Sequence, residues 1–131
     1  MRPLTRRLWP GSSGVYLIGV ALLAGGLGLA VWARVYLGRN WSGTVSVKEA
    51  HELIRTGPYA IVRHPIYAGF ITALVGSVLN FGHMRSFIAA VMVILAWIYK
   101  SRLEETFMRD HFGREYDQYC HDVKRLIPKI W

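Results

Sequence analysis

The sequence predicts an all-α, multi-pass membrane protein with about three transmembrane helices, one alone and two in a helical hairpin, followed by a cytoplasmic C-terminal helical segment. Apolar residues make up 53% of the 131-residue chain and charged residues only 18%, whereas roughly a quarter of an ordinary soluble domain is charged. The apolar residues gather in three uncharged runs. The basic residues, which give a formal charge of +8, stand between these runs, as charges that flank a membrane do.

The chain is expected to form one domain over residues 1–131. No long Gly-, Ser- or Pro-rich linker divides it, and its length suits a single core. Because the basic residues are not gathered on one polar domain, nucleic acid is not an expected partner. Cys120 is the only cysteine, so neither an intrachain disulfide nor a cysteine-rich metal site is predicted.

The first transmembrane segment is predicted over residues 15–35. From Val15 to Ala33 the chain has no charge, which at 1.5 Å per residue is close to the thickness of a bilayer core of about 30 Å. A cleaved signal peptide is the alternative, because the start is basic and residues 31–33 resemble a cleavage site. The run is longer than the roughly 7–15 apolar residues of such peptides, and we therefore expect a retained helix.

Two further segments, predicted over residues 66–82 and 86–100, form the hairpin. Pro65 suits the first turn of a helix, where its missing N–H costs nothing. The few residues between the two runs allow only a tight turn. The third run is short for a full crossing, so we expect it to be tilted or to extend through Lys100, whose long side chain can reach the interface.

The basic residues predict which side each polar segment faces. If three helices cross the membrane, segments 34–65 and 100–131 share a side, and they hold twelve Arg and Lys against four elsewhere. The positive-inside rule then places both segments in the cytoplasm. We expect a site where they meet, formed by residues 44–69 and 100–128.

The tail beyond residue 100 is predicted to be helical and amphipathic. Phe112, Tyr116, Tyr119 and Val123 recur at spacings of three or four residues. Gly113 is expected to interrupt the preceding helix, and Pro128 to end the last one. The stripe fits either an interfacial helix that lies on the membrane or a lid over the site, and its spacing favours neither.

Motifs of several soluble enzyme classes are absent. The chain has no GxGxxG after a strand, no Walker loop, no HExxH and no GxSxG, so dinucleotide, nucleotide and protease chemistries lose their usual support. Its five histidines form no pair at helical ligand spacing with a carboxylate as third ligand. No metal site is therefore predicted.

Polar side chains cluster at the expected membrane edge. Arg63 and His64 could be ordinary snorkelling anchors, but residues 48–67 hold more hydrogen-bonding and aromatic groups than an anchor needs. The third helix returns Glu104 and Glu105 to the same side. As a simple surface arrangement, Glu105 would pair with Arg109 at i,i+4. A binding site is the alternative to an anchor.

Small residues form two rows on the second helix, Ala68, Thr72, Gly76 and Gly69, Ala73, Ser77. Such rows let another helix approach closely. The first helix has a looser set, Ala21 with Gly25 and Gly26 with Ala30. We expect these faces either to pack on one another within the chain or to mediate a homo-oligomer.

Four motifs follow one another along the chain: Gly57-Pro58-Tyr59, Arg63-His64-Pro65-x-Tyr67-x-Gly69, Glu104-Glu105, and Phe112-Gly113-x-x-Tyr116-x-x-Tyr119 with Val123-x-Arg125-x-Ile127-Pro128 behind it. In this order and spacing they resemble the integral-membrane isoprenylcysteine carboxyl methyltransferases and the related phospholipid N-methyltransferases. The resemblance runs from about Leu37 to Pro128.

The resemblance implies S-adenosylmethionine as cofactor, held between the cytoplasmic ends of membrane helices and the C-terminal segment. Ring faces of Tyr59 and Tyr67 can hold a sulfonium cation, and Glu104 can bind an ammonium group or ribose hydroxyls. Carried over by position, the implied cofactor-binding residues are His51, Glu52, Leu53, Ile54, Tyr59, His64, Pro65, Ile66, Tyr67 and Glu104.

The resemblance also implies a lipophilic or lipidated acceptor that reaches the site sideways from the bilayer. The carboxyl methyltransferases have an arginine four residues before the cofactor glutamate to orient the acceptor carboxylate. Here that position is Lys100, which keeps the charge but loses the bidentate fork. The predicted catalytic residues are Lys100, Arg102 and Arg63.

Two kinds of acceptor and two other classes of protein are compatible with these motifs. Carboxyl O-methylation of the isoprenylcysteine type is the first interpretation, and N-methylation of a phospholipid or lipid amine is the near alternative. A non-catalytic membrane interaction protein is the distant one. Sterol reductases share a similar C-terminal motif, but the small size of this chain argues against them.

Overall fold

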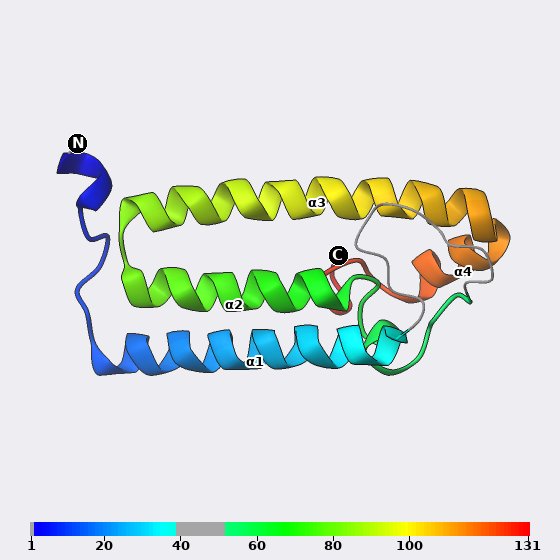
Figure 1. Ribbon diagram of the computed structural model, residues 1–131, viewed down its shortest axis with the longest axis horizontal. Coiled ribbons are helices and arrows are strands. Elements are labelled where there is room, and N and C mark those ends of the chain that lie inside the picture. Colours follow the sequence, from blue (N-terminus) through cyan, green and yellow to red (C-terminus); the bar gives the residue numbers. More distant parts are fainter. Residues whose placement is uncertain (1, 39–51) are drawn as a thin grey trace.

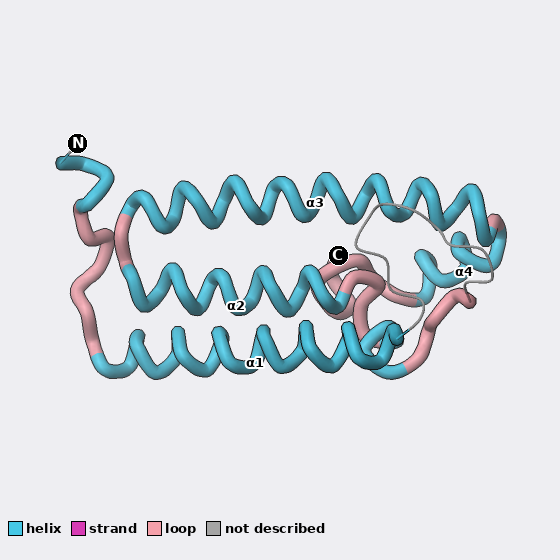
Figure 2. The backbone as a smooth tube through the Cα atoms, viewed as in Figure 1, coloured by secondary structure: helices cyan, strands magenta, loops and turns pink. Residues whose placement is uncertain are grey.

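In the part of the chain that the structure describes, three long helices lie side by side, and a short helix and the C-terminal tail cover one end of them (Figure 1). The structure is a computed structural model that describes residues 2–38 and 52–131. Among these residues it has no β-strand (Figure 2). The elements are η1 (Arg2–Thr5), α1 (Ser13–Leu37), η3 (Gly57–Ala60), α2 (Pro65–Phe81), α3 (Met84–Phe112) and α4 (Arg114–Asp122). The expected all-α class is confirmed.

The predicted helical hairpin is formed by α2 and α3. Pro65 is the first residue of α2, as its fixed φ and missing N–H favour. Gly82 ends α2 in the left-handed conformation, with φ 63°, which glycine adopts without the steric cost of a side chain. His83 then precedes α3 directly.

Helix α3 is longer than the segment expected at 86–100. It runs without a break to Phe112 and ends at Gly113, whose φ is 57°. Hydrophobicity falls after Tyr99, but the residues that follow are rich in strong helix formers such as Lys, Arg, Leu, Glu and Met. Lys100, Glu104 and Glu105 therefore project from one rigid helix.

Helices α1 and α2 pack through small residues. A Cβ atom on Gly26 would lie 2.4 Å from the carbonyl oxygen of Gly69, and one on Gly76 would lie 2.4 Å from that of Gly19. Such close backbone approach needs glycine on both helices. Gly25 and Gly28, by contrast, face open space. The predicted close packing within the chain is confirmed, and a homo-oligomer stays a prediction.

The apolar side chains of α1 and α3 face mostly outward. Both helices are long and apolar enough to cross a membrane, and little of their apolar length is buried inside the molecule. Helix α2 is a shorter apolar helix. Large exposed side chains such as Leu17, Val31, Met92 and Leu95 suit a lipid environment, where outward apolar surface is not exposed to water.

Helix α4 turns back over the end of the bundle where α1 ends and α2 begins (Figure 1). Tyr116 and Tyr119, two members of the predicted stripe, are each only 2% exposed, and the Tyr119 hydroxyl donates a hydrogen bond of 2.7 Å to the Tyr59 carbonyl. The helix ends at Asp122, so the expectation that it continues to Pro128 is wrong. Val123 is extended, which lets the tail pair with the segment before α2.

Candidate functional site

The polar residues singled out in the sequence meet at the end of the bundle covered by α4. They come from the segment that joins η3 to α2, from the middle of α3 and from the tail after α4. The first contact among them is between backbones. The Arg63 N–H donates to the Lys124 carbonyl at 2.8 Å, and the His64 N–H donates to the Arg125 carbonyl at 3.1 Å. The tail is thus tied to the residues that open α2.

Glu105 is the buried centre of this arrangement, with 1% of its side chain exposed. Its Oε1 accepts from Arg63 Nε at 3.0 Å and from Arg125 Nε at 3.1 Å, and it lies 3.1 Å from His64 Nε2. Its Oε2 accepts from Arg125 Nη2 at 2.7 Å. A buried carboxylate needs such partners, because an uncompensated charge in a low-dielectric interior is very costly. The simple surface alternative, in which Glu105 pairs with Arg109, is not what the structure has, since Arg109 instead contacts Asp117.

These partners keep Glu105 ionised. Burial by itself would raise the pKa of the Glu105 carboxyl, but hydrogen bonds from His64, Arg125 and Arg63 hold that pKa well below its usual range. Glu105 lies beyond the predicted span at 86–100, at the polar end of α3. The carboxylate therefore acts only as a hydrogen-bond acceptor.

Arg63 is used mainly to hold the protein together. Besides its two bonds to Glu105, its Nη1 donates to the carbonyls of Cys120 and Val123. Four of the five N–H donors of a guanidinium are thus engaged by protein groups. Arg63 joins three elements, and its predicted role at the reacting groups stays a prediction.

Glu104 points to a different set of partners from its neighbour. Its Oε1 accepts a hydrogen bond of 2.6 Å from the Tyr67 hydroxyl, and its Oε2 lies 3.6 Å from His64 Nδ1. A quarter of the side chain is exposed. Glu104 is thus a carboxylate that is held in place and still accessible.

Aromatic rings lie beside Glu104, between α2 and α3. The rings of His64 and Tyr67 are stacked with centroids 5.8 Å apart, and Trp97 stacks on Tyr67 at 6.4 Å and on Phe70 at 5.5 Å. The Lys100 Nζ lies 5.7 Å from the centre of the Tyr67 ring, a cation–π distance. Trp97, Lys100 and Glu104 share one face of α3, because they are three and four residues apart.

The other predicted residues are more loosely connected to this cluster. Tyr59 and Pro65 are buried, Leu53, Ile54 and Ile66 are half-buried, and Glu52 is exposed. Burial raises the pKa of the Tyr59 hydroxyl, and the charge of Glu104 raises it further. His51 lies outside the described residues.

Arg102 lies on another face of α3 than Lys100, which is also a predicted catalytic residue. At 100° per residue, it points about 160° away from both Lys100 and Glu104 around α3, and it is exposed. Lys100 is the basic residue that α3 presents to Tyr67.

The sequence did not predict that Trp97 and Arg125 belong to the site. Trp97 was part of an apolar run, although its spacing to Lys100 and Glu104 would have placed it on the same face. Arg125 belonged to a quoted motif without a role, because its partner Glu105 is 20 residues away in sequence. Such long-range ion pairs leave no local pattern.

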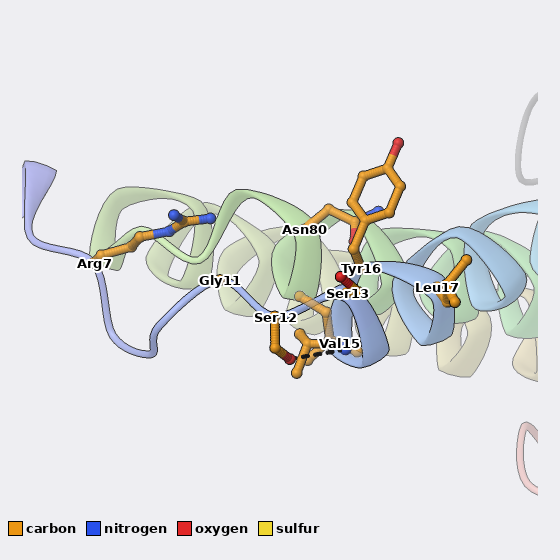
Figure 3. Close-up of a pocket in the computed structure, with 9 residues that line it drawn as sticks. Arg7, Gly11, Ser12, Ser13, Val15, Tyr16, Leu17 and Asn80 are labelled. Carbon is orange, nitrogen blue, oxygen red and sulfur yellow. Dashed lines mark hydrogen bonds between the residues drawn. The ribbon is translucent and has the colours of Figure 1, made fainter.

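A pocket of about 390 Å³ lies at the opposite end of the bundle (Figure 3). Here the N-terminal segment crosses the α2–α3 turn, with the Leu8 N–H donating to the Gly82 carbonyl at 2.7 Å and the Trp9 ring N–H to the Leu79 carbonyl at 3.0 Å. The pocket is lined by Arg7, Gly11, Ser12, Ser13, Val15, Tyr16, Leu17, Leu79 and Asn80. Neither Glu104 and Glu105 nor the residues that contact them line this pocket.

Fold and site together define a small helical protein with apolar helices and a polar, aromatic site at one end of them. The sequence profile of the phospholipid methyltransferase family matches residues 15–115, which is most of the chain. The chain therefore belongs to the phospholipid methyltransferase family.

Individual relatives agree with this assignment. A probable protein-S-isoprenylcysteine O-methyltransferase from Oryza sativa subsp. indica is 31% identical over 121 residues, which cover 88% of this chain and 62% of the relative. Methanethiol S-methyltransferase 1 from Bradyrhizobium diazoefficiens is 45% identical over 71 residues, covering 53% of this chain and 24% of that protein.

A solved structure has the same arrangement of helices. The eukaryotic intramembrane Ras methyltransferase, an isoprenylcysteine carboxyl methyltransferase, matches with a TM-score of 0.76 and 27% identity over 89% of this chain and 43% of its own. This chain thus spans less than two thirds of the length of the relatives it matches.

Proposed function

We propose that this chain transfers a methyl group from S-adenosylmethionine to a lipophilic acceptor at a membrane, as isoprenylcysteine carboxyl methyltransferases do. The observation that carries the proposal is the accessible Glu104 carboxylate, bonded to the Tyr67 hydroxyl at 2.6 Å. Beside it, the Tyr67 ring already accommodates a cation, Lys100 Nζ at 5.7 Å. Membership of a methyltransferase family supports the same conclusion.

The residues present fit S-adenosylmethionine. That molecule has an ammonium group and ribose hydroxyls, and a partly exposed carboxylate such as Glu104 can accept hydrogen bonds from them. It also has a sulfonium cation, which a Tyr face attracts. When bound, it supplies an electrophilic methyl group. The protein's tasks are then to hold the two reactants in line and to exclude water.

Each residue of the cluster has a part in these tasks. Glu104 and Tyr67 would hold the donor, and the predicted contacts from His51, Glu52, Leu53, Ile54, Tyr59, Pro65 and Ile66 would complete its binding. The buried ion pairs of Glu105 keep α3, the opening of α2 and the tail together. Lys100, on the same face of α3 as Glu104, can orient an anionic acceptor. Arg102, which is exposed on another face, would attract that acceptor farther from the donor.

A carboxylate is the acceptor that Lys100 favours. A carboxylate needs no base before it is methylated, only a cation to orient it, and Lys100 is the basic residue beside Tyr67. Similarity to protein-S-isoprenylcysteine O-methyltransferases supports such an acceptor on a lipidated protein.

Methylation of a lipid amine is the second candidate. The family is described as phospholipid methyltransferase, and His64 lies beside Glu104, where an imidazole can take the proton that an ammonium acceptor must lose. This reaction would use the same donor site.

We further propose three membrane crossings with the site on the cytoplasmic side. The twelve basic residues of segments 34–65 and 100–131 against four elsewhere support this orientation. Helix α2, at 17 residues and about 25 Å, is short for a crossing, and thinning of the bilayer can accommodate it at modest cost. The close packing of α1 on α2 supports a retained first helix.

Labelling of membranes with an isotopically marked methyl donor tests the proposal. Membranes from cells with and without the chain are compared by mass spectrometry of lipids and lipidated proteins. Base-labile methyl esters that depend on the chain support the first candidate, and base-stable N-methyl products support the second. Absence of both, together with no binding of S-adenosylhomocysteine by calorimetry, contradicts methyl transfer.

A further inference from the structure

His64 lies between the two adjacent glutamates of α3. Its Nε2 is 3.1 Å from Glu105 Oε1, and its Nδ1 is 3.6 Å from Glu104 Oε2. Only 9% of the His64 side chain is exposed. The two ring nitrogens therefore face two different environments, one inside the protein and one at the proposed site.

The environment of Glu105 decides where a proton sits on this ring. An ionised carboxylate can only accept hydrogen bonds, and Glu105 Oε1 already accepts from Arg63 and Arg125. The contact with His64 is favourable only if Nε2 bears the hydrogen. A bare Nε2 lone pair would face a negative oxygen at 3.1 Å.

From this geometry we propose that Glu105 is a positioning residue, which fixes the Nε2–H form of His64 and leaves Nδ1 as the nitrogen presented to Glu104. In a neutral ring the lone pair is then on Nδ1, on the Glu104 side of the ring, where the methyl donor is proposed to bind. The hydrogen-bond partner of one ring nitrogen commonly sets the role of the other in this way. The inference deepens the proposed function and rests on it for its relevance to methyl transfer.

Several charged groups face His64 and set the conditions of the test. Glu104 and Glu105 come from α3, Arg63 precedes the ring in sequence, and Arg125 reaches Glu105 from the tail. Tyr67 of α2 is stacked against the ring. Any change in one of them can alter the ring's protonation, so the measurement must report each nitrogen separately.

The direct test is ¹⁵N NMR of the full chain in lipid nanodiscs, with ¹⁵N-labelled histidine and no donor or acceptor. The His64 signals are assigned from their absence in His64→Gln, and the exposed His111 ring serves as the internal control. We expect His64 Nε2 to have the shift of a protonated nitrogen at every pH at which the chain is folded. A neutral ring with hydrogen on Nδ1 and a bare Nε2 would overturn the proposal.

Variants then separate positioning from general stability. Glu105→Gln should give His64 a mixture of tautomers, whereas Arg125→Lys, which weakens the same buried cluster but leaves the His64–Glu105 contact, should not. Glu105→Asp should restore part of the single tautomer. If Glu105→Gln keeps the pure Nε2–H form, Glu105 does not fix it and the proposal fails. If Glu105→Gln does not fold, the proposal is tested by the tautomer seen in the wild-type spectrum and in the spectrum of Glu105→Asp.

Catalysis provides an additional readout. Orienting partners of functional histidines in metal sites typically account for about 10- to 100-fold in activity, and we expect a loss of kcat/KM in that range for Glu105→Gln. A wild-type kcat/KM in that variant would contradict a positioning role. The NMR measurement needs no methyl transfer. The tautomer assignment can therefore fail while the proposed function stands, and the proposed function can fail while the tautomer assignment stands.

Discussion

The Tyr67 hydroxyl donates to the Glu104 carboxylate across 2.6 Å, and this one bond joins the first turn of α2 to the middle of α3. The two residues are 37 positions apart in sequence. Their side chains meet because α2 and α3 form a hairpin and α3 continues unbroken past the apolar run. The bond fixes one carboxylate oxygen of Glu104 while the side chain keeps a quarter of its surface exposed.

Replacement of Glu104 by Ala should remove the main polar contact of the proposed donor site. A hydrogen bond to a charged group contributes about 1.5–3 kcal/mol, so we expect S-adenosylhomocysteine to bind about 10- to 100-fold more weakly by calorimetry, with the protein still inserted in the membrane. Asp110→Ala, which removes an exposed carboxylate from the same helix, is the matched control. Equal affinity of Glu104→Ala and wild type would show that the site is wrongly placed.

The ring and the hydroxyl of Tyr67 can be tested separately. Tyr67→Phe keeps the aromatic face that contacts Trp97 and Lys100 but loses the bond to Glu104, and we expect a several-fold loss of affinity for S-adenosylhomocysteine. Tyr67→Ala also loses the ring, and its loss should be clearly larger. Equal affinities for the two variants would mean that the ring face does not contribute.

Much of the fold could be predicted because membrane segments leave strong local signals. Pro65 and Gly113 marked helix ends correctly, and the rows with Gly69 and Gly76 marked the face that packs on α1. The end of α3 could not be read from hydrophobicity, because strong helix formers carry the helix on after its apolar side chains stop.

The candidate site was less predictable from local patterns. Glu105 looked like a surface partner of Arg109, because i,i+4 spacing is visible in a sequence and a long-range cluster is not. Its actual partners Arg63 and Arg125 lie 42 and 20 residues away. The resemblance to a family supplied Tyr67 and Glu104, whereas their roles beside Lys100 required the three-dimensional arrangement.

Lys100 should affect the acceptor more than the donor. If the acceptor is a carboxylate, Lys100→Ala should raise its KM or lower kcat/KM by about tenfold or more, since a charge-assisted contact is lost, while S-adenosylhomocysteine affinity changes little. Lys100→Arg should retain activity, because arginine keeps the charge and adds a bidentate fork. Arg114→Ala, an exposed arginine of α4, controls for charge. A larger effect of Arg102→Ala than of Lys100→Ala would favour the opposite face of α3.

Acid should weaken the buried cluster around Glu105. Its pKa is lowered in the folded protein despite burial, by His64, Arg125 and Arg63, so the unfolded chain binds the proton more readily. The stabilisation is fully present above the unfolded pKa of about 4.3 and is lost as the pH falls below it. The melting temperature in detergent should therefore drop steeply below about pH 4.3.

Two variants identify the group responsible for that drop. Glu105→Gln should melt at a lower temperature at pH 7, because it leaves buried cations uncompensated, and its melting temperature should fall less steeply with acid. Glu115→Gln, which changes an exposed carboxylate, should follow the wild-type curve. An acid dependence as steep in Glu105→Gln as in wild type would assign it to other groups.

The packing of α1 on α2 gives a sharp test with two adjacent glycines. In Gly26→Ala the new Cβ would lie 2.4 Å from the Gly69 carbonyl oxygen and from the Ala73 nitrogen, both backbone atoms that cannot turn aside. Overpacking of this kind typically costs about 1–3 kcal/mol, and the better helix propensity of alanine returns up to about 1 kcal/mol. Gly25→Ala gains the same propensity and meets open space. We therefore expect the melting temperature in detergent to fall in Gly26→Ala and to stay level or rise in Gly25→Ala.

The same pair of variants should also differ in ligand binding. Because η3 packs against α1, a shift of α1 should disturb the turn that holds Tyr59, and the affinity for S-adenosylhomocysteine should fall in Gly26→Ala alone. Equal melting temperatures for the two variants would contradict close contact between these helices.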